Sequence, residues 1–222
     1  MYMRMQNIEF HSTFSSPRQS SSELGLCSRL TENVYLSPHF ELREFTESAT
    51  ARKHGIENEP PAEAVENLKA LCNHTLEPLR EALGLPIVIN SGYRCKALNL
   101  LLVNHSVKSQ HMEGQAADFL VQGCPSGESA HARNNSNELG SPLAQSQTSK
   151  FKVQGESHRE RLIRAFRTII LDERIGFDQL IIYPTFIHVS YVRNGKNRGQ
   201  LTKASGNGKY QALSRAQALA LL

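Results

Sequence analysis

The sequence contains no tryptophan, only four cysteines among 222 residues, and no long hydrophobic run. The cysteines lie far apart and form no CxxC pair, which argues against a zinc site made of cysteines. A stretch of about 18 apolar residues is absent, so we expect no membrane-spanning helix. The residues up to Phe14 also lack the apolar segment of a secretory signal, so no signal peptide is expected.

Neither sign of charge dominates the sequence. Lysine and arginine number 25 against 21 acidic residues, which leaves a formal net charge of +4. Proteins that bind nucleic acids usually concentrate basic residues on one face, so we expect no nucleic-acid partner here. Hydrophobic residues make up 39% and charged residues 21% of the chain, a composition that is typical of folded globular proteins and argues against a disordered chain.

Composition divides the chain into one ordered part and three polar segments. Residues 1–35 are rich in serine and predict a flexible leader, and 123–155 predict a polar insertion because large apolar residues are scarce there. Residues 193–222 predict a basic tail, in which 210–222 can form a terminal helix. The remainder, 36–192 apart from the insertion, carries the hydrophobic periodicity of one domain.

Regular apolar spacing predicts the helices and strands of this domain. A stripe of apolar residues over 61–83 predicts a long helix, and Pro78 within it predicts a kink or a division near Glu77. Ser157 and Glu160 have the spacing of a capping box that opens a further helix. We also expect one helix that begins at Ser37, a second that ends before Gly55 and a third over 95–103. The expected strands are 86–90, 115–121, 178–183 and 186–192, the last two as a hairpin.

Histidine and aspartate occur at a spacing that a metal can use. His111 and Asp118 flank Gly114, which permits a turn, and period-two alternation places Ala116 and Asp118 on the same face of a strand. His188 lies in a neighbouring apolar strand and is the candidate third ligand. Two imidazoles and one carboxylate leave a fourth tetrahedral position for water, as in a catalytic zinc site. Alternatively, His188 is a hydrogen-bonded core residue and the segment from His111 to Asp118 is an ordinary turn.

Four motifs occur in a fixed order along the chain. They are Ser-Pro-His-Phe over 37–40 leading to Glu44 and Phe45, Asn-Ser-Gly-Tyr-Arg over 90–94, the segment Ser109 to Asp118 with His111, Gly114 and Ala116, and Phe-Asp-Gln-Leu-Ile over 177–181 running into His188. With these motifs the sequence resembles the zinc D-Ala-D-Ala carboxypeptidase family of peptidoglycan peptidases, especially its branch of small C-terminal-type domains. The resemblance covers about 36–122 and 156–192.

This resemblance implies a fold and a set of roles. The fold is α+β, a compact single domain with a small antiparallel sheet that carries one zinc site and is flanked by helices. One zinc ion lies between His111, Asp118 and His188. Arg94 binds a substrate carboxylate or the carbonyl under attack, and Ser109 lies close to the site. In such enzymes zinc polarises the scissile carbonyl and activates a water, while a carboxylate takes its proton.

The chain departs from this family where the general base is expected. Relatives carry a catalytic carboxylate three or about five residues before the last histidine, and these positions hold Thr185 and Tyr183 here. Glu113 and Asp178 are the candidates to replace it, although Asp178 also suits a structural role. A tyrosine with a pKa of about 10 is a poor base but can donate a hydrogen bond to an oxyanion.

Two functional hypotheses remain. One is a zinc metallopeptidase that cuts a bond involving D-amino acids in peptidoglycan stem peptides, as a carboxypeptidase or as an endopeptidase. The other is a degenerate zinc domain that binds cell-wall peptides without efficient hydrolysis. A structural zinc protein without a wall substrate is a third interpretation. We expect a monomer that meets peptidoglycan stem peptides, located in the cytoplasm by default or released to the cell wall without a signal peptide.

Overall fold

A computed structural model describes residues 34–103, 106–123 and 156–221. The chain divides after Glu32 into two units, and every described residue belongs to the second unit. The leader predicted over 1–35 lies almost wholly outside the described residues, and so does the polar insertion predicted over 123–155. Both therefore stay predictions.

The described chain begins with short elements: β1 (Tyr35–Ser37), β2 (Phe40–Glu41), α1 (Leu42–Thr46) and α2 (Ala49–His54). The prediction of a helix beginning at Ser37 is wrong, because the Ser37 hydroxyl donates to Glu77 Oε1 at 2.7 Å and caps no helix. α1 begins at Leu42 instead, where Glu41 and Glu44 form a capping box. Gly55 ends α2 with a φ of 63°, which agrees with the predicted end of this helix.

The long helical stripe is divided, as the position of Pro78 predicts. α3 (Ala62–Leu71) is followed by η1 (Cys72–Leu76), a π-helical turn, and then by α4 (Glu77–Leu83). Proline has no N–H for the carbonyl of His74, and this carbonyl accepts a hydrogen bond from the backbone N–H of Gly176 at 2.9 Å. Within the described ranges, no helix is long and apolar enough to cross a membrane.

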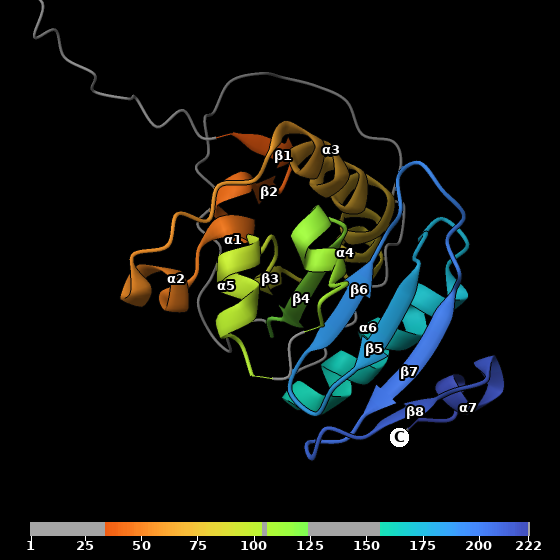
Figure 1. Cartoon of the computed structure of the whole chain (residues 1–222). Coiled ribbons are helices and arrows are strands. Elements are labelled where there is room, and N and C mark those ends of the chain that lie inside the picture. Colours follow the sequence, from red (N-terminus) through yellow and green to blue (C-terminus); the bar gives the residue numbers. More distant parts are fainter. Residues whose placement is uncertain (1–33, 104–105, 124–155, 222) are drawn as a thin grey trace, which may run out of the picture. The chain divides into compact units, whose positions relative to one another are not determined.

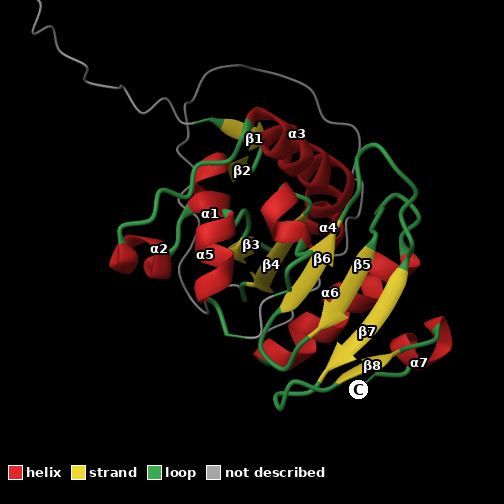
Figure 2. Ribbon diagram, viewed as in Figure 1, coloured by secondary structure: helices red, strands yellow, loops and turns green. Residues whose placement is uncertain are grey.

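One sheet of six strands, in the order β3-β4-β6-β5-β7-β8, runs through this part of the chain (Figure 1, Figure 2). Its strands are β3 (Ile87–Ser91), β4 (Ala116–Val121), β5 (Gln179–Ile182), β6 (Ile187–Ser190), β7 (Gln200–Ala204) and β8 (Tyr210–Ala212). Neighbouring strands are antiparallel except β5 and β7, which are parallel. The α+β class is confirmed, as is the hairpin of β5 and β6, but the sheet is larger than expected and mixed.

The two faces of this sheet differ in character. Phe119 and Leu180 lie on the face that packs into the hydrophobic core, to which α4 and α6 (His158–Leu171) also contribute. α6 begins at the predicted capping box of Ser157 and Glu160. A row of four residues in register across β4, β6, β5 and β7 lies on the opposite face: Asp118, His188, Ile181 and Thr202. All four line a single cavity, so this face is its floor.

The segment predicted as a basic tail forms part of the sheet. β7 pairs with β5 and β8 pairs with β7, and Leu201 and Ala204 of β7 are buried. The helix that the sequence allowed over 210–222 is confined to α7 (Arg215–Leu219), because Tyr210–Ala212 pairs as β8 and the Ser214 side chain caps the helix after it. The segment joins the sheet because its strand β7 pairs with β5, which lies outside the segment.

Candidate metal centre

His111 is positioned by a short 3₁₀ turn, η2 (Gln110–Glu113), which follows α5 (Lys96–Leu101) and precedes β4. Gly114 ends η2 with a φ of 68°, a backbone conformation that favours glycine. A Cβ atom at this position would lie 2.4 Å from the carbonyl oxygen of Ala64, so close packing on α3 also requires glycine. The turn predicted after His111 is therefore confirmed, and η2, which carries this histidine, packs against α3.

Asp118 and His188 are opposite each other on antiparallel strands. They form a cross-strand pair between β4 and β6, so both side chains rise from the same face of the sheet. Ala116 and Ala117 in β4 are fully buried, which agrees with small residues being needed beneath the site. The pairing of two strands that are 70 residues apart thus brings the aspartate to the histidine.

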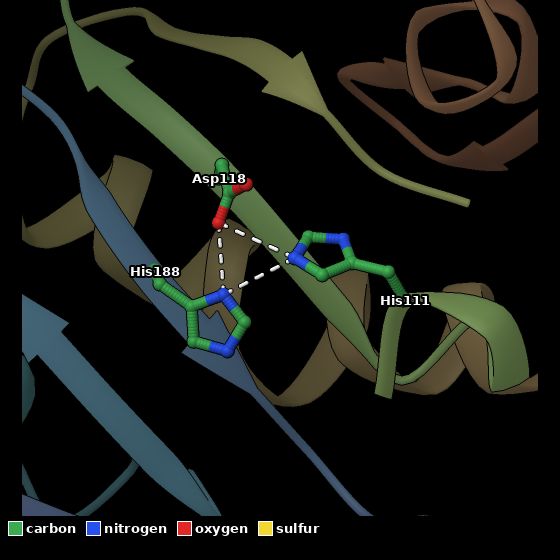
Figure 3. Close-up of side chains that lie close together, drawn as sticks. All are labelled: His111, Asp118 and His188. Carbon is green, nitrogen blue, oxygen red and sulfur yellow. Dashed lines mark hydrogen bonds and ion pairs between the residues drawn. The ribbon is translucent and has the colours of Figure 1, made fainter. Parts of the chain in front are cut away.

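The three side chains converge on one point, as Figure 3 shows. His188 Nδ1 lies 2.8 Å from Asp118 Oδ1, and His111 Nε2 lies 3.2 Å from His188 Nδ1 and 3.3 Å from Asp118 Oδ1. Zinc bonds of about 2.0–2.1 Å in a tetrahedron place the ligand atoms about 3.3 Å apart. The cluster therefore fits a zinc ion with little movement, and its two nitrogens and one oxygen are ligands that zinc accepts.

The orientation of His111 is set by a second hydrogen bond. Its Nδ1 lies 2.6 Å from the carbonyl oxygen of Gly92, so Nδ1 carries the proton and donates it to this carbonyl. Nε2 is then left with a free lone pair that faces Asp118 and His188. Gly92 permits this arrangement because a Cβ there would lie 2.6 Å from Cβ of Phe45 in α1. Such a backbone partner is a common way to orient a metal-binding histidine.

The buried cluster favours the protonation states that a metal requires. Burial alone would raise the pKa of Asp118, but His111 and then His188 hold it well below its usual range. Burial lowers the pKa of His111, against the attraction of the Asp118 charge. The lowered pKa of Asp118 keeps the carboxylate ionised, and the lowered pKa of His111 favours release of any Nε2 proton shared with Asp118, so both side chains readily take the forms that metal ions bind.

Arg94 lies next to the cluster. Its backbone N–H donates to the carbonyl of His111 at 3.1 Å, and Nη2 of its guanidinium lies 3.3 Å from Asp118 Oδ2. Burial lowers the pKa of Arg94 while Asp118 raises it. The Nε donor is buried and, among the described residues, has no hydrogen-bond partner. The residue nevertheless lines the cavity over the cluster, so other parts of its guanidinium are open to a ligand.

A cavity of about 680 Å³ opens over the cluster, within the size range of about 300–1,000 Å³ that is usual for ligand sites. Its lining includes the residues predicted for the site: Arg94, Ser109, His111, Asp118, Tyr183 and His188. Asp118 is the only carboxylate among the described residues that line it. The three candidate ligands therefore lie where a substrate has access to them.

Comparison with protein families identifies the chain. The family model described as Peptidase M15 matches residues 38–151, just over half of the sequence. The chain belongs to the peptidase M15 family. This family is zinc-dependent, and the resemblance seen in the motifs is confirmed. No curated protein matches the chain. The matched residues include Arg94, His111 and Asp118, whereas His188 lies beyond them and reaches the cluster through the pairing of β6 with β4.

The two carboxylates considered as replacements for the general base, Glu113 and Asp178, do not line the cavity. Glu113 is exposed, and so is Thr185, which occupies one of the two positions where the base was expected and does not line the cavity either. Asp178 is buried beside Arg198, with 3.0 Å between Arg198 Nε and Asp178 Oδ1. Burial alone would raise the pKa of Asp178, but its hydrogen bonds with Arg198 lower it, so this carboxylate is held as an ion pair.

Tyr183, at the other position where the base was expected, lines the cavity. Its hydroxyl lies 3.2 Å from that of Tyr210, and its ring stacks on Phe186 with the centroids 4.2 Å apart. Burial, followed by the hydrogen bond with Tyr210, raises the pKa of Tyr183 above its usual value. The phenol therefore keeps its proton and is suited to donate a hydrogen bond rather than to accept a proton.

Sequence reasoning missed part of the site of this M15 peptidase. Arg198, Gln200, Thr202 and Tyr210 line the cavity from β7, β8 and the loop before β7, all within the segment expected to be a tail. Gln200–Ala204 contains a single large apolar residue, Leu201, and no period-two alternation, so the sequence alone does not distinguish this strand from a loop.

Proposed function

We propose that this M15 peptidase hydrolyses a peptide bond involving D-amino acids in peptidoglycan stem peptides, with zinc held by His111, Asp118 and His188. The observation that supports this most directly is the convergence of His111 Nε2, His188 Nδ1 and Asp118 Oδ1 at 2.8–3.3 Å beneath an open cavity. A site with three protein ligands leaves one position open, which is the arrangement of catalytic rather than structural zinc.

The residues around the cluster suggest distinct roles in this reaction. Bound zinc would supply Lewis acidity for the scissile carbonyl and a water of lowered pKa. The planar guanidinium of Arg94, which lines the cavity, suits a substrate carboxylate or carbonyl. Ser109 lines the same cavity, and the protonated phenol of Tyr183 can donate to an oxygen that gains negative charge.

The cavity lining also fits a negatively charged substrate. Arg94, Lys108 and Arg198 line it; Arg94 is paired with Asp118 and Arg198 with Asp178, which leaves Lys108 without an acidic partner among the described residues. A stem peptide that carries free carboxylates would be attracted by Lys108 and by a bound zinc ion. The same argument applies to a free C-terminal carboxylate and to a side-chain carboxylate, so charge alone does not choose between the removal of a terminal residue and internal cleavage.

Two measurements test the proposed function. Metal analysis of the purified protein should find about one zinc ion per chain, and His111→Ala, Asp118→Ala and His188→Ala should each lose it. Zinc-loaded protein incubated with muropeptides should release D-alanine or a shortened stem peptide, detected by mass spectrometry. A protein that never retains zinc contradicts the proposal, and so does a zinc-loaded protein that neither cleaves nor binds any muropeptide.

A second function is supported by the composition of the cavity. Among the described residues that line it, no carboxylate accompanies Asp118, and a peptidase of this type needs a group to take the proton of the attacking water. A zinc domain that binds stem peptides without efficient hydrolysis fits this arrangement. Binding of muropeptides to the zinc-loaded protein without any product would favour this function over the peptidase.

A further inference from the structure

The cavity continues well beyond the three clustered residues. From Asp118 and His188 its floor extends across β5 to β7 and β8. β8 forms the edge of the sheet opposite β3 (Figure 1). Gln179 and Ile181 of β5 and Tyr183 directly after it line the cavity at alternate positions, and Gln200 and Thr202 do so in β7. The parallel register pairs Gln179 with Gln200 and Ile181 with Thr202, so the two rows form one continuous surface.

Gln179 and Gln200, two residues of this floor, are hydrogen-bonded to each other through their side-chain amides. Gln179 Nε2 donates to Gln200 Oε1 at 3.0 Å. Within the described part of the chain, the Gln200 amide nitrogen and the Gln179 side-chain oxygen have no hydrogen-bond partner. They present one donor and one acceptor side by side, which is the pair of groups that a peptide backbone needs.

Aromatic side chains form the far end of the same surface. The Tyr183 and Tyr210 rings are nearly perpendicular, at 89°, with centroids 6.2 Å apart. Tyr210 is 58% exposed although it lines the cavity, so much of its ring is available to a ligand. A phenol that is apolar along its ring and polar at its tip commonly contacts peptides in this way.

We propose that the face of β5, β7 and β8 is a subsite for the peptide residues that flank the bond to be cut, so that a longer stem peptide is bound in preference to a short one. This rests on the proposed function of the cluster and extends it. Gln179 and Gln200 hold the peptide backbone, and Tyr210 covers a side chain. Such a subsite has a use in cleavage within a peptide and little use in a site limited to the terminal residue.

The test uses a nested series of synthetic D-alanine-containing stem peptides, lengthened by one residue at a time on either side of the D-Ala bond. Binding to the zinc-loaded full chain is measured by isothermal titration calorimetry, and cleavage is followed in parallel by mass spectrometry. We expect at least one longer peptide to bind more tightly than the shortest one. Gln200→Ala and Tyr210→Ala should each reduce this advantage about threefold to tenfold, as expected for one lost hydrogen bond and for the lost contact of one aromatic ring.

Matched substitutions outside the cavity serve as controls. Gln211→Ala makes the same change at an exposed glutamine of β8 that does not line the cavity, and Tyr35→Ala does so at a tyrosine that is also 58% exposed. Both should keep the full advantage of the longer peptide. The subsite is refuted if no peptide gains affinity with length, or if the gain survives in Gln200→Ala and Tyr210→Ala. Length-dependent binding without cleavage would support the subsite while contradicting the peptidase.

Discussion

Zinc should stabilise the folded protein, because the three ligand atoms are already close to their positions around a metal. They lie 2.8–3.3 Å apart, compared with about 3.3 Å in a tetrahedral zinc site, so the three side chains need to rearrange little when zinc binds. Free zinc at about 100 times its Kd should raise the free energy of unfolding by about 2.7 kcal/mol. For a chain of this size that corresponds to an increase of roughly 5–10 °C in Tm.

Differential scanning calorimetry of the metal-free and zinc-loaded protein measures this increase directly. Asp118→Ala should abolish most of it, while His54→Ala, which removes an exposed histidine at the end of α2, should leave it unchanged. Magnesium should have little effect, because imidazole suits zinc far better than magnesium. An equal increase of Tm in Asp118→Ala and in the unaltered protein would show that zinc binds elsewhere and would refute the reasoning.

Three further predictions concern the surroundings of the cluster. Arg94→Ala should retain zinc but lower kcat/KM for muropeptides about 10- to 100-fold, as expected for a lost charge-assisted hydrogen bond, and unchanged kinetics would contradict its role. The pKa of Asp178 is lower in the folded than in the unfolded protein, so its contribution to the free energy of unfolding is complete above about pH 4 and is lost as the pH falls through the folded pKa. Urea unfolding at a series of acidic pH values should therefore show a smaller fall in the free energy of unfolding for Asp178→Asn than for the unaltered protein. Gly92→Ala should destabilise the fold by about 1–3 kcal/mol and weaken zinc binding, because its Cβ would lie 2.6 Å from Cβ of Phe45. Thermal unfolding and zinc titration measure both effects, and neither should appear in the control Gly206→Ala, where a Cβ would meet nothing within 4 Å.

The sequence predicted those parts of the fold and site that depend on local patterns. The division of the helical stripe follows from Pro78, and the turn after His111 follows from Gly114. Two of the three clustered residues, His111 and Asp118, lie in one short motif, and the strand Ala116–Val121 gives Ala116 and Asp118 the common face that period-two alternation predicted. The hairpin that carries His188 was recognisable because both of its strands are strongly apolar.

The parts that were missed depend on contacts between distant segments. β7 is parallel to β5, and a parallel pair is joined by a long connection that leaves no turn signal in the sequence. The Ser37-Pro38 pair has the composition of a helix start, but Glu77 in α4 accepts the Ser37 hydroxyl and the chain forms β1 instead. Local preference was thus overridden by a partner 40 residues away.

Asp178 links segments that the chain order keeps apart. Its carboxylate accepts hydrogen bonds from the Gln110 side chain at 3.0 Å and from the Arg198 backbone at 2.9 Å, and Gln110 immediately precedes His111. The turn that carries His111 and the loop that leads into β7 are therefore anchored on one buried charge. Insertions or deletions near Arg198 should therefore displace His111 through this anchor, although the two segments lie far apart along the chain.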